Sequence, residues 1–174
     1  MNKLLVLLIA LGCIAALVVG CSSSPTKRIG TYDSRAIASA FVGSNEGMEF
    51  ITNPPAEWTK AKAARNDSLI RHIERTAAAW ARLNRLRVFS VGSVADILEK
   101  HKAQVDSVAR AAGVRIIVSK FELILTGTGV DTVDVTVPLA RIFITPGQVR
   151  NWVSQTPTQK PISMLEALAI PPEK

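Results

Sequence analysis

The chain opens with an uninterrupted apolar run and only then changes to a mixture of apolar and polar positions. Residues 4–20 carry no charged side chain, and one cation, Lys3, precedes them. A short positive start, an apolar stretch and small residues at its end are the layout of a secretory signal peptide. The pattern therefore predicts that residues 1–20 are a signal peptide, which export removes.

The apolar run ends at a cysteine. Val18-Val19-Gly20-Cys21 resembles the lipobox of bacterial lipoproteins, and Ser22-Ser23-Ser24-Pro25 follows as a polar spacer. The resemblance implies that Cys21 is acylated and that residues 21–27 form a flexible tether. An uncleaved transmembrane anchor is the alternative, because the apolar run lies at the short end of what spans a bilayer. Both interpretations place the rest of the chain outside the cytoplasm.

Helical periodicity dominates the middle of the chain. Residues 56–86 contain no Gly or Pro, and their apolar residues recur at spacings of three and four, which predicts one long helix. A second helical pattern follows up to Ala112, with Ser93 and Asp96 spaced as in a capping box and Gly113 as the terminating residue. Because a short loop joins the two patterns, we expect an antiparallel helical hairpin over about 56–112.

Strand patterns flank this hairpin. Residues 28–33 predict a short strand that leads into a helix over 34–41, and residues 114–125 are the strongest strand signal of the chain. The sequence Thr126-Gly127-Thr128-Gly129 predicts a turn, after which residues 130–135 would pair back as a β-hairpin.

The remaining signals are caps and chain breaks. Asp134 or Thr136 would cap a helix ahead of Pro138, and further short helices are expected near Thr145-Pro146 and Pro161. The predicted fold class is therefore α+β: a small antiparallel or mixed β-sheet with a projecting α-helical hairpin and short C-terminal helices. We expect one domain over 28–170 and a loose tail over 171–174.

Charge is concentrated in the predicted hairpin. The chain has a formal net charge of +7, and between residues 55 and 88 eight Lys and Arg stand against three Asp and Glu. Arginine can combine ion pairing with apolar packing of its stem, and tryptophan adds amphipathic contact area. The candidate binding surface consists of Trp58, Lys60, Lys62, Arg65, Arg71, Arg75, Trp80, Arg82, Arg85 and Arg87. The alternative is a solvated helix face whose tryptophans are buried in the hairpin.

Cysteine content and charge narrow the classes of partner. Cys13 leaves with the signal peptide and Cys21 is acylated, so the exported domain has no disulfide and depends on packing. A basic exported protein favours acidic partners such as anionic headgroups, cell-wall polymers or acidic polypeptides. Nucleic acid is not expected, because export separates the chain from it.

No pattern of catalytic or metal-binding residues emerges. His72 and His101 have no partner at metal-ligand spacing, and we expect the first to be solvated and the second to be buried and hydrogen-bonded. Asp33 and Ser34 are expected to end a strand and cap a helix rather than to converge with Arg35 on a substrate. Asp131 and Asp134 are expected in a turn or cap. The sequence predicts no enzyme, no cofactor and no metal.

The order of strand, helical hairpin, strand pair and terminal helix resembles the Skp/OmpH family of periplasmic chaperones. The resemblance is carried by residues 28–34 (Arg-Ile-Gly-Thr-Tyr-Asp-Ser), 113–118 (Gly-Val-Arg-Ile-Ile-Val) and 133–136 (Val-Asp-Val-Thr). It implies a trimer whose helical arms enclose a cavity for unfolded outer-membrane proteins.

Export, charge and this resemblance together give a functional expectation. We expect an envelope lipoprotein that is held on the membrane by its N-terminal lipid and faces the periplasm, on the outer membrane where the bacterium has two. It would bind unfolded or acidic envelope proteins as a chaperone-like holdase. A homo-oligomer, a trimer as in Skp, is the expected assembly that follows from the resemblance. The alternative is a structural adaptor or scaffold that binds the cell wall or an envelope complex.

Overall fold

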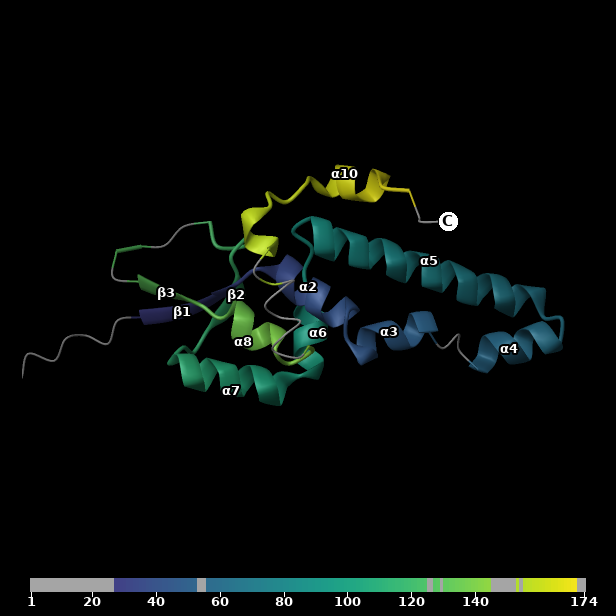
Figure 1. Cartoon of the computed structure of the whole chain (residues 1–174), viewed down its shortest axis with the longest axis horizontal. Coiled ribbons are helices and arrows are strands. Elements are labelled where there is room, and N and C mark those ends of the chain that lie inside the picture. The colour runs from purple at the N-terminus through teal and green to yellow at the C-terminus, as the bar shows by residue number, and fades with distance from the viewer. Residues whose placement is uncertain are drawn as a thin grey trace, which may run out of the picture.

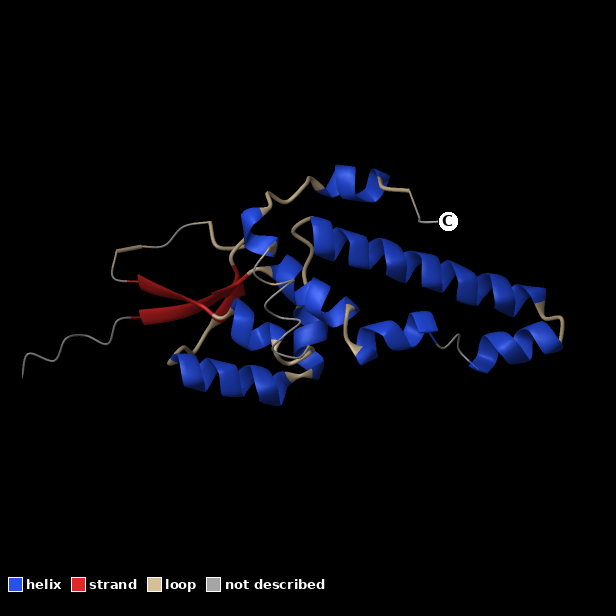
Figure 2. Ribbon diagram, in the orientation of Figure 1, coloured by secondary structure: helices blue, strands red, loops and turns tan. Residues whose placement is uncertain are grey.

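The computed structural model describes residues 27–52, 56–124, 127–128, 130–144, 153 and 155–171. It is α+β, with helices predominating around a small sheet, so the predicted fold class is confirmed (Figures 1 and 2). The predicted signal peptide and nearly all of the tether lie outside the described residues. The same holds for the helix expected at Thr145-Pro146, for half of the glycine turn and for most of the tail.

Within the described residues, three strands form one parallel sheet. Strand β1 (Lys27–Tyr32) lies between β2 (Ile117–Ser119) and β3 (Val130–Asp134), and both neighbours run parallel to it. The expected β-hairpin between β2 and β3 is therefore wrong. The chain turns immediately after β2, where the amide of Glu122 donates to the carbonyl of Ser119 at 3.0 Å. Residue propensity marks these segments as strands but does not select their partner.

The central strand contains a glycine because its neighbours approach closely. A Cβ atom at Gly30 would lie 3.0 Å from Cγ1 of Ile117 and 3.2 Å from Cγ2 of Val114. These separations are shorter than normal carbon–carbon contacts, so a side chain here would push β2 away from β1. Gly30 thus allows β1 to occupy the middle of the sheet.

The core is built around one buried helix. Helix α2 (Ser34–Val42) follows β1 directly, and the Asp33 side chain caps it by accepting from the amide of Arg35, as the sequence predicted. Its Ile37 and its alanines are fully buried among residues of α8 (Thr136–Ala140) and α6 (Ala95–Lys100). Small side chains let these helices approach closely, which places α2 at the centre of the packed layer.

A helical arm projects from this core. After α3 (Asn45–Thr52), helix α4 (Ala56–Ala63) runs to a tight turn, and α5 (Asp67–Phe89) returns beside it. The single helix expected over 56–86 is wrong at this turn. Arg65 adopts a left-handed backbone with φ 51°, and the Asn66 side chain accepts from the amide of Leu69 to start α5. The turn lies at one end of the longest axis, and β1 begins towards the other (Figure 1).

The long helix does not pair with the helix predicted to be its partner. Helix α5 packs mainly on α2, α4 and α10 (Met164–Ala169), whereas α7 (Lys102–Ala112) packs on α8. The reason is the buried connection after α5, in which Ser90 and Val94 are fully enclosed and redirect the chain through the core. The hairpin is therefore α4–α5 rather than α5–α7.

The start of α6 also differs from the prediction, whereas two later signals are confirmed. The Ser93–Asp96 capping box does not form, because the Asp96 carboxylate pairs with Arg87 instead. Gly113 ends α7 with φ 66°, a left-handed conformation that glycine adopts without strain. After the 3-10 turn η1 (Thr156–Thr158), the helix expected near Pro161 begins at Met164.

Candidate functional site

The predicted binding residues gather on the arm but divide by exposure. Trp58, Trp80 and Arg85 are half-buried, and Arg87 is buried. The other six are exposed: Lys60, Lys62, Arg65, Arg71, Arg75 and Arg82.

Three of the exposed arginines form one line along α5. Arg75 follows Arg71 by four positions and Arg82 follows Arg75 by seven, which are the spacings of one helix face. Trp80 follows Arg71 by nine, which is two and a half helical turns and therefore the opposite side. Trp80 indeed packs against the core. We call Arg71, Arg75 and Arg82 the arginine stripe; at about 1.5 Å per residue it runs for about 16 Å.

The cations of the arm are uncompensated. In the part of the chain that the structure describes, none of the six exposed arm cations takes part in an ion pair. The ammonium of Lys62 lies 3.7 Å from the centre of the Trp58 ring, and Nε of Arg75 donates to the carbonyl of Arg71 at 3.2 Å. Neither contact cancels charge, so the arm presents a positive field that attracts polyanions.

Arg87 does not belong to this surface, contrary to the sequence prediction. Its side chain is buried, and its Nε donates to the carbonyl of Ser93 at 2.8 Å. Its guanidinium also pairs with Asp96. Arg87 therefore holds the connection between α5 and α6, and its charge is not available to a partner.

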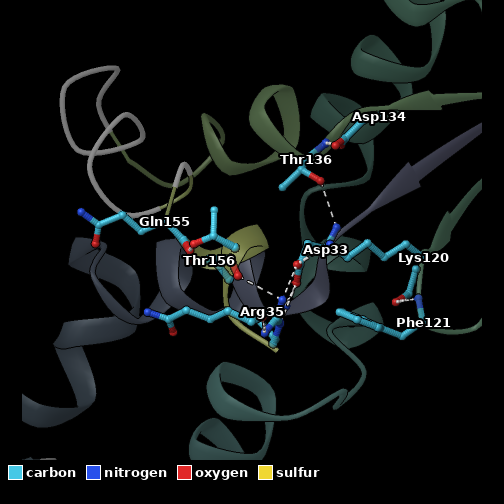
Figure 3. Close-up of polar contacts among 11 residues, drawn as sticks. Asp33, Arg35, Lys120, Phe121, Asp134, Thr136, Gln155 and Thr156 are labelled. Atoms are coloured by element: carbon cyan, nitrogen blue, oxygen red, sulfur yellow. Dashed lines mark hydrogen bonds and ion pairs between the residues drawn. The ribbon is translucent and has the colours of Figure 1, made fainter. Parts of the chain in front are cut away.

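A second polar cluster lies at the carboxyl ends of the strands, where parallel sheets commonly place ligands. Asp33 is 1% exposed and accepts from Nη2 of Arg35 at 2.8 Å and from Nζ of Lys120 at 2.7 Å (Figure 3). Burial alone would raise the pKa of Asp33. The hydrogen bonds and positive charges of Arg35 and Lys120 outweigh burial and hold this pKa below its usual range.

The same cluster ties distant segments together. Nη1 and Nη2 of Arg35 donate to the carbonyls of Gln159 and Thr156 at 2.6 and 3.1 Å. The amide of Asp33 donates to Oγ1 of Thr136 at 2.9 Å. These bonds join the C-terminal segment, α2 and α8 around one carboxylate. Sequence reasoning missed the convergence because it considered only the residues next to Asp33 in the chain. Lys120 and the carbonyls of Thr156 and Gln159 are brought to Asp33 and Arg35 by the fold.

The polar groups of the cluster are paired with one another and with backbone groups of other segments. Asp33 is already saturated by donors, and burial, followed by the charge of Glu122, raises the pKa of the adjacent Tyr32 to about 12. No three His, Cys, Asp or Glu side chains of the described residues come together as metal ligands. The cluster therefore holds together segments that lie far apart in the sequence.

The two histidines lie on different elements, His72 on α5 next to Arg71 and His101 at the junction of α6 and α7. His101 is largely enclosed, with Nε2 3.0 Å from a carboxylate oxygen of Glu46 and its ring edge-on to Phe143. This placement confirms the expected hydrogen-bonded side chain, which is half-buried rather than buried. His72 is exposed on α5, also as expected.

The two aspartates near β3 are accounted for by local contacts. Asp131 pairs with Arg28 at 3.2 Å, and Oδ1 of Asp134 accepts from the amide of Thr136 at the start of α8. Both aspartates lie in β3 rather than in a turn, and the N-cap position of α8 is Val135; Asp134, one residue earlier, satisfies the amide of the first helical residue.

Comparison of the chain with protein families, with characterised proteins and with solved structures finds no match. Among the described helices, none combines the length and the apolar character that crossing a bilayer requires.

Proposed function

We propose that this chain is an envelope lipoprotein that binds acidic, non-native polypeptides through its α4–α5 arm and keeps them from aggregating. The observation that carries the proposal is the arginine stripe: three exposed arginines on one face of a projecting helix, none of which forms an ion pair with another described residue. Guanidinium groups bind carboxylates in a planar, two-pronged geometry, which suits Asp- and Glu-rich segments.

The position of the arm supports the same proposal. The arm turn lies at the far end of the molecule from the start of β1, where the tether from Cys21 enters the domain (Figure 1). A lipid on Cys21 would then leave the arm pointing away from the membrane, towards polypeptides in the periplasm. The resemblance to Skp/OmpH chaperones, with a trimer of arms around a client, is part of this proposal.

An aggregation-suppression assay tests it. Light scattering of an unfolded outer-membrane barrel protein is followed with the mature chain and with Arg71→Glu/Arg75→Glu/Arg82→Glu. The matched control is Lys100→Glu/Arg110→Glu/Arg115→Glu, which makes the same change in net charge at exposed sites outside the arm. We expect suppression by the wild type and the control, loss of suppression in the stripe variant, and weakening with salt.

Two other results would contradict the proposed function. Equal suppression by the stripe variant and the control would refute the role of the arm. Capture of one defined folded partner from solubilised envelopes, without suppression of aggregation, would favour the structural adaptor.

A further inference from the structure

Helix α10 turns its large apolar side chains outward. Met164, Leu165 and Leu168 are 57%, 80% and 42% exposed, whereas the small Ala167 is 1% exposed. A surface helix ordinarily buries its large apolar residues and exposes polar ones. The reversed arrangement leaves an apolar surface on a helix that ends in contact with α5.

This surface is held in place rather than left as a frayed end. Ser163 and Glu166 form a reciprocal capping box at the start of α10. The amide of Ile162 donates to the carbonyl of Phe89 at 3.1 Å, and α10 packs on α5. Figure 1 shows α10 running beside the C-terminal half of α5. The exposed side chains are therefore presented by a fixed backbone.

Phe89 links the face of the arginine stripe to the start of α10, because its carbonyl accepts from the amide of Ile162, two residues before α10 begins. Phe89 follows Arg82 by seven positions, so it lies on the same face of α5, and it is 48% exposed. Arg85, between them, is half-buried, with an Nε that is shielded and has no hydrogen-bond partner. The face of α5 thus passes from cationic at Arg71 to apolar at Phe89, and α10 begins next to Phe89.

We propose that the arginine stripe, Phe89 and the exposed side chains of α10 form one surface, which binds polypeptide segments that carry acidic residues beside large apolar ones. The inference rests on the proposed function and specifies its client. Charge complementarity selects this occupant, because a purely apolar segment would leave the arginines without counter-charges. A purely acidic segment would leave Phe89 and α10 uncovered. Contiguous apolar surface that persists on a folded protein marks interaction sites.

The test uses two fluorescent peptides of equal length and equal negative charge. One combines Glu with Leu and Phe, and the other has Ser in place of Leu and Phe. Binding to the mature protein is measured by fluorescence anisotropy at low and high salt. We expect the wild type to bind the first peptide about tenfold more tightly, and high salt to weaken both.

Variants then separate the two halves of the surface. Met164→Ser/Leu168→Ser and, separately, Leu165→Ser should weaken binding of the first peptide and leave binding of the second unchanged. The control, Ile116→Ser/Val137→Ser, removes comparable exposed apolar groups outside the arm and α10 and should change neither. Leu165 is so exposed that its replacement keeps the test valid if the double variant fails to fold.

The outcomes distinguish this inference from the proposed function. If the stripe variant no longer binds either peptide while the α10 variants bind both as the wild type does, the inference is overturned and the proposed function stands. If no variant changes binding, both are overturned. If both sets of variants instead abolish binding to phosphatidylglycerol vesicles and neither peptide binds, the surface is a membrane-contact site and the inference is also overturned.

Discussion

At the scale of single residues, Asp33 shows how one carboxylate can organise a small fold. It caps α2 and forms ion pairs with both Arg35 and Lys120. Because Lys120 follows β2 and Arg35 also donates to the carbonyl of Gln159, Asp33 connects β1 with β2 and with the C-terminal segment. Arg35 is itself 3% exposed, so its charge depends on this one partner. A buried ion pair adds little to stability compared with apolar packing, but removing one member leaves the other without a counter-charge.

Replacing Asp33 by Asn should therefore be costly. We expect Asp33→Asn to lower the free energy of unfolding by about 3–5 kcal/mol, because the shape is kept while Arg35 remains buried. Urea denaturation measures the change. Asp131→Asn, which breaks the exposed pair with Arg28, is the control and should cost less than about 1 kcal/mol. Similar losses in the two variants would mean that Asp33 is not the anchor.

The lowered pKa of Asp33 predicts a pH dependence with a defined sign. In the unfolded chain the pKa of Asp33 is close to its ordinary value of about 3.9, and in the folded protein it is lower. At pH values between these two pKa values, the unfolded state therefore binds more protons than the folded state. Stability from Asp33 is then present at neutral pH and decreases as pH falls through the folded pKa. Urea unfolding between pH 7 and 3 should show this decrease, with a shallower slope in Asp33→Asn. Identical slopes would contradict the assignment.

At the scale of elements, the break between α4 and α5 defines the arm. Arg65 carries it in a left-handed conformation that costs a non-glycine residue roughly 1–2 kcal/mol. We expect Arg65→Gly to raise the free energy of unfolding by about 0.5–1 kcal/mol, because glycine adopts this backbone without strain. Thermal and urea unfolding measure it. Ala79→Gly in the exposed middle of α5 should instead lower stability by about 1 kcal/mol. A loss in Arg65→Gly would show that the arginine stem contributes more than the strain costs.

The same elements show what the sequence can and cannot predict. Asn66 is a capping residue and marks the start of α5, but without Gly or Pro nearby the periodicity on both sides merged into one predicted helix. Helix identity, the Asp33 cap and the Gly113 terminator follow from local chemistry, and these were predictable. Partner choice was not: the redirection after α5 depends on buried Arg87, Ser90 and Val94, whose environment exists only in the folded chain.

The candidate surface likewise has features that the sequence predicts and features that it does not. Arg71, Arg75 and Arg82 were predictable as a basic face because their spacing alone places them together. That Arg87 turns inward and that α10 exposes Met164 and Leu165 depends on tertiary packing. Charge spacing along a helix is a local property, whereas exposure is decided by distant segments.

At the scale of the whole molecule, the start of β1 and the turn of the proposed binding arm lie towards opposite ends of the long axis (Figure 1). On a membrane, residues near the start of β1 would then lie close to the lipid and the arm turn far from it. A fluorophore placed by Asp131→Cys should be quenched by brominated lipids in vesicles that carry the acylated protein. One placed by Arg65→Cys should not, because such quenching acts only over short distances. After the proposed cleavage the chain would otherwise contain only Cys21, which the proposed acylation blocks, so the labels would be specific.

Two controls complete this experiment. Cys21→Ser, combined with either label, should abolish quenching at both sites, because the lipid is what brings the domain to the membrane. Quenching at residue 65 but not at 131 would refute the orientation and would make the arm a membrane-contact element. Quenching at neither site with the acylated protein would mean that the tether holds the whole domain beyond the reach of the lipid. The polarity of the molecule, anchor at the sheet and arm towards the client, is thus tested separately from client binding itself.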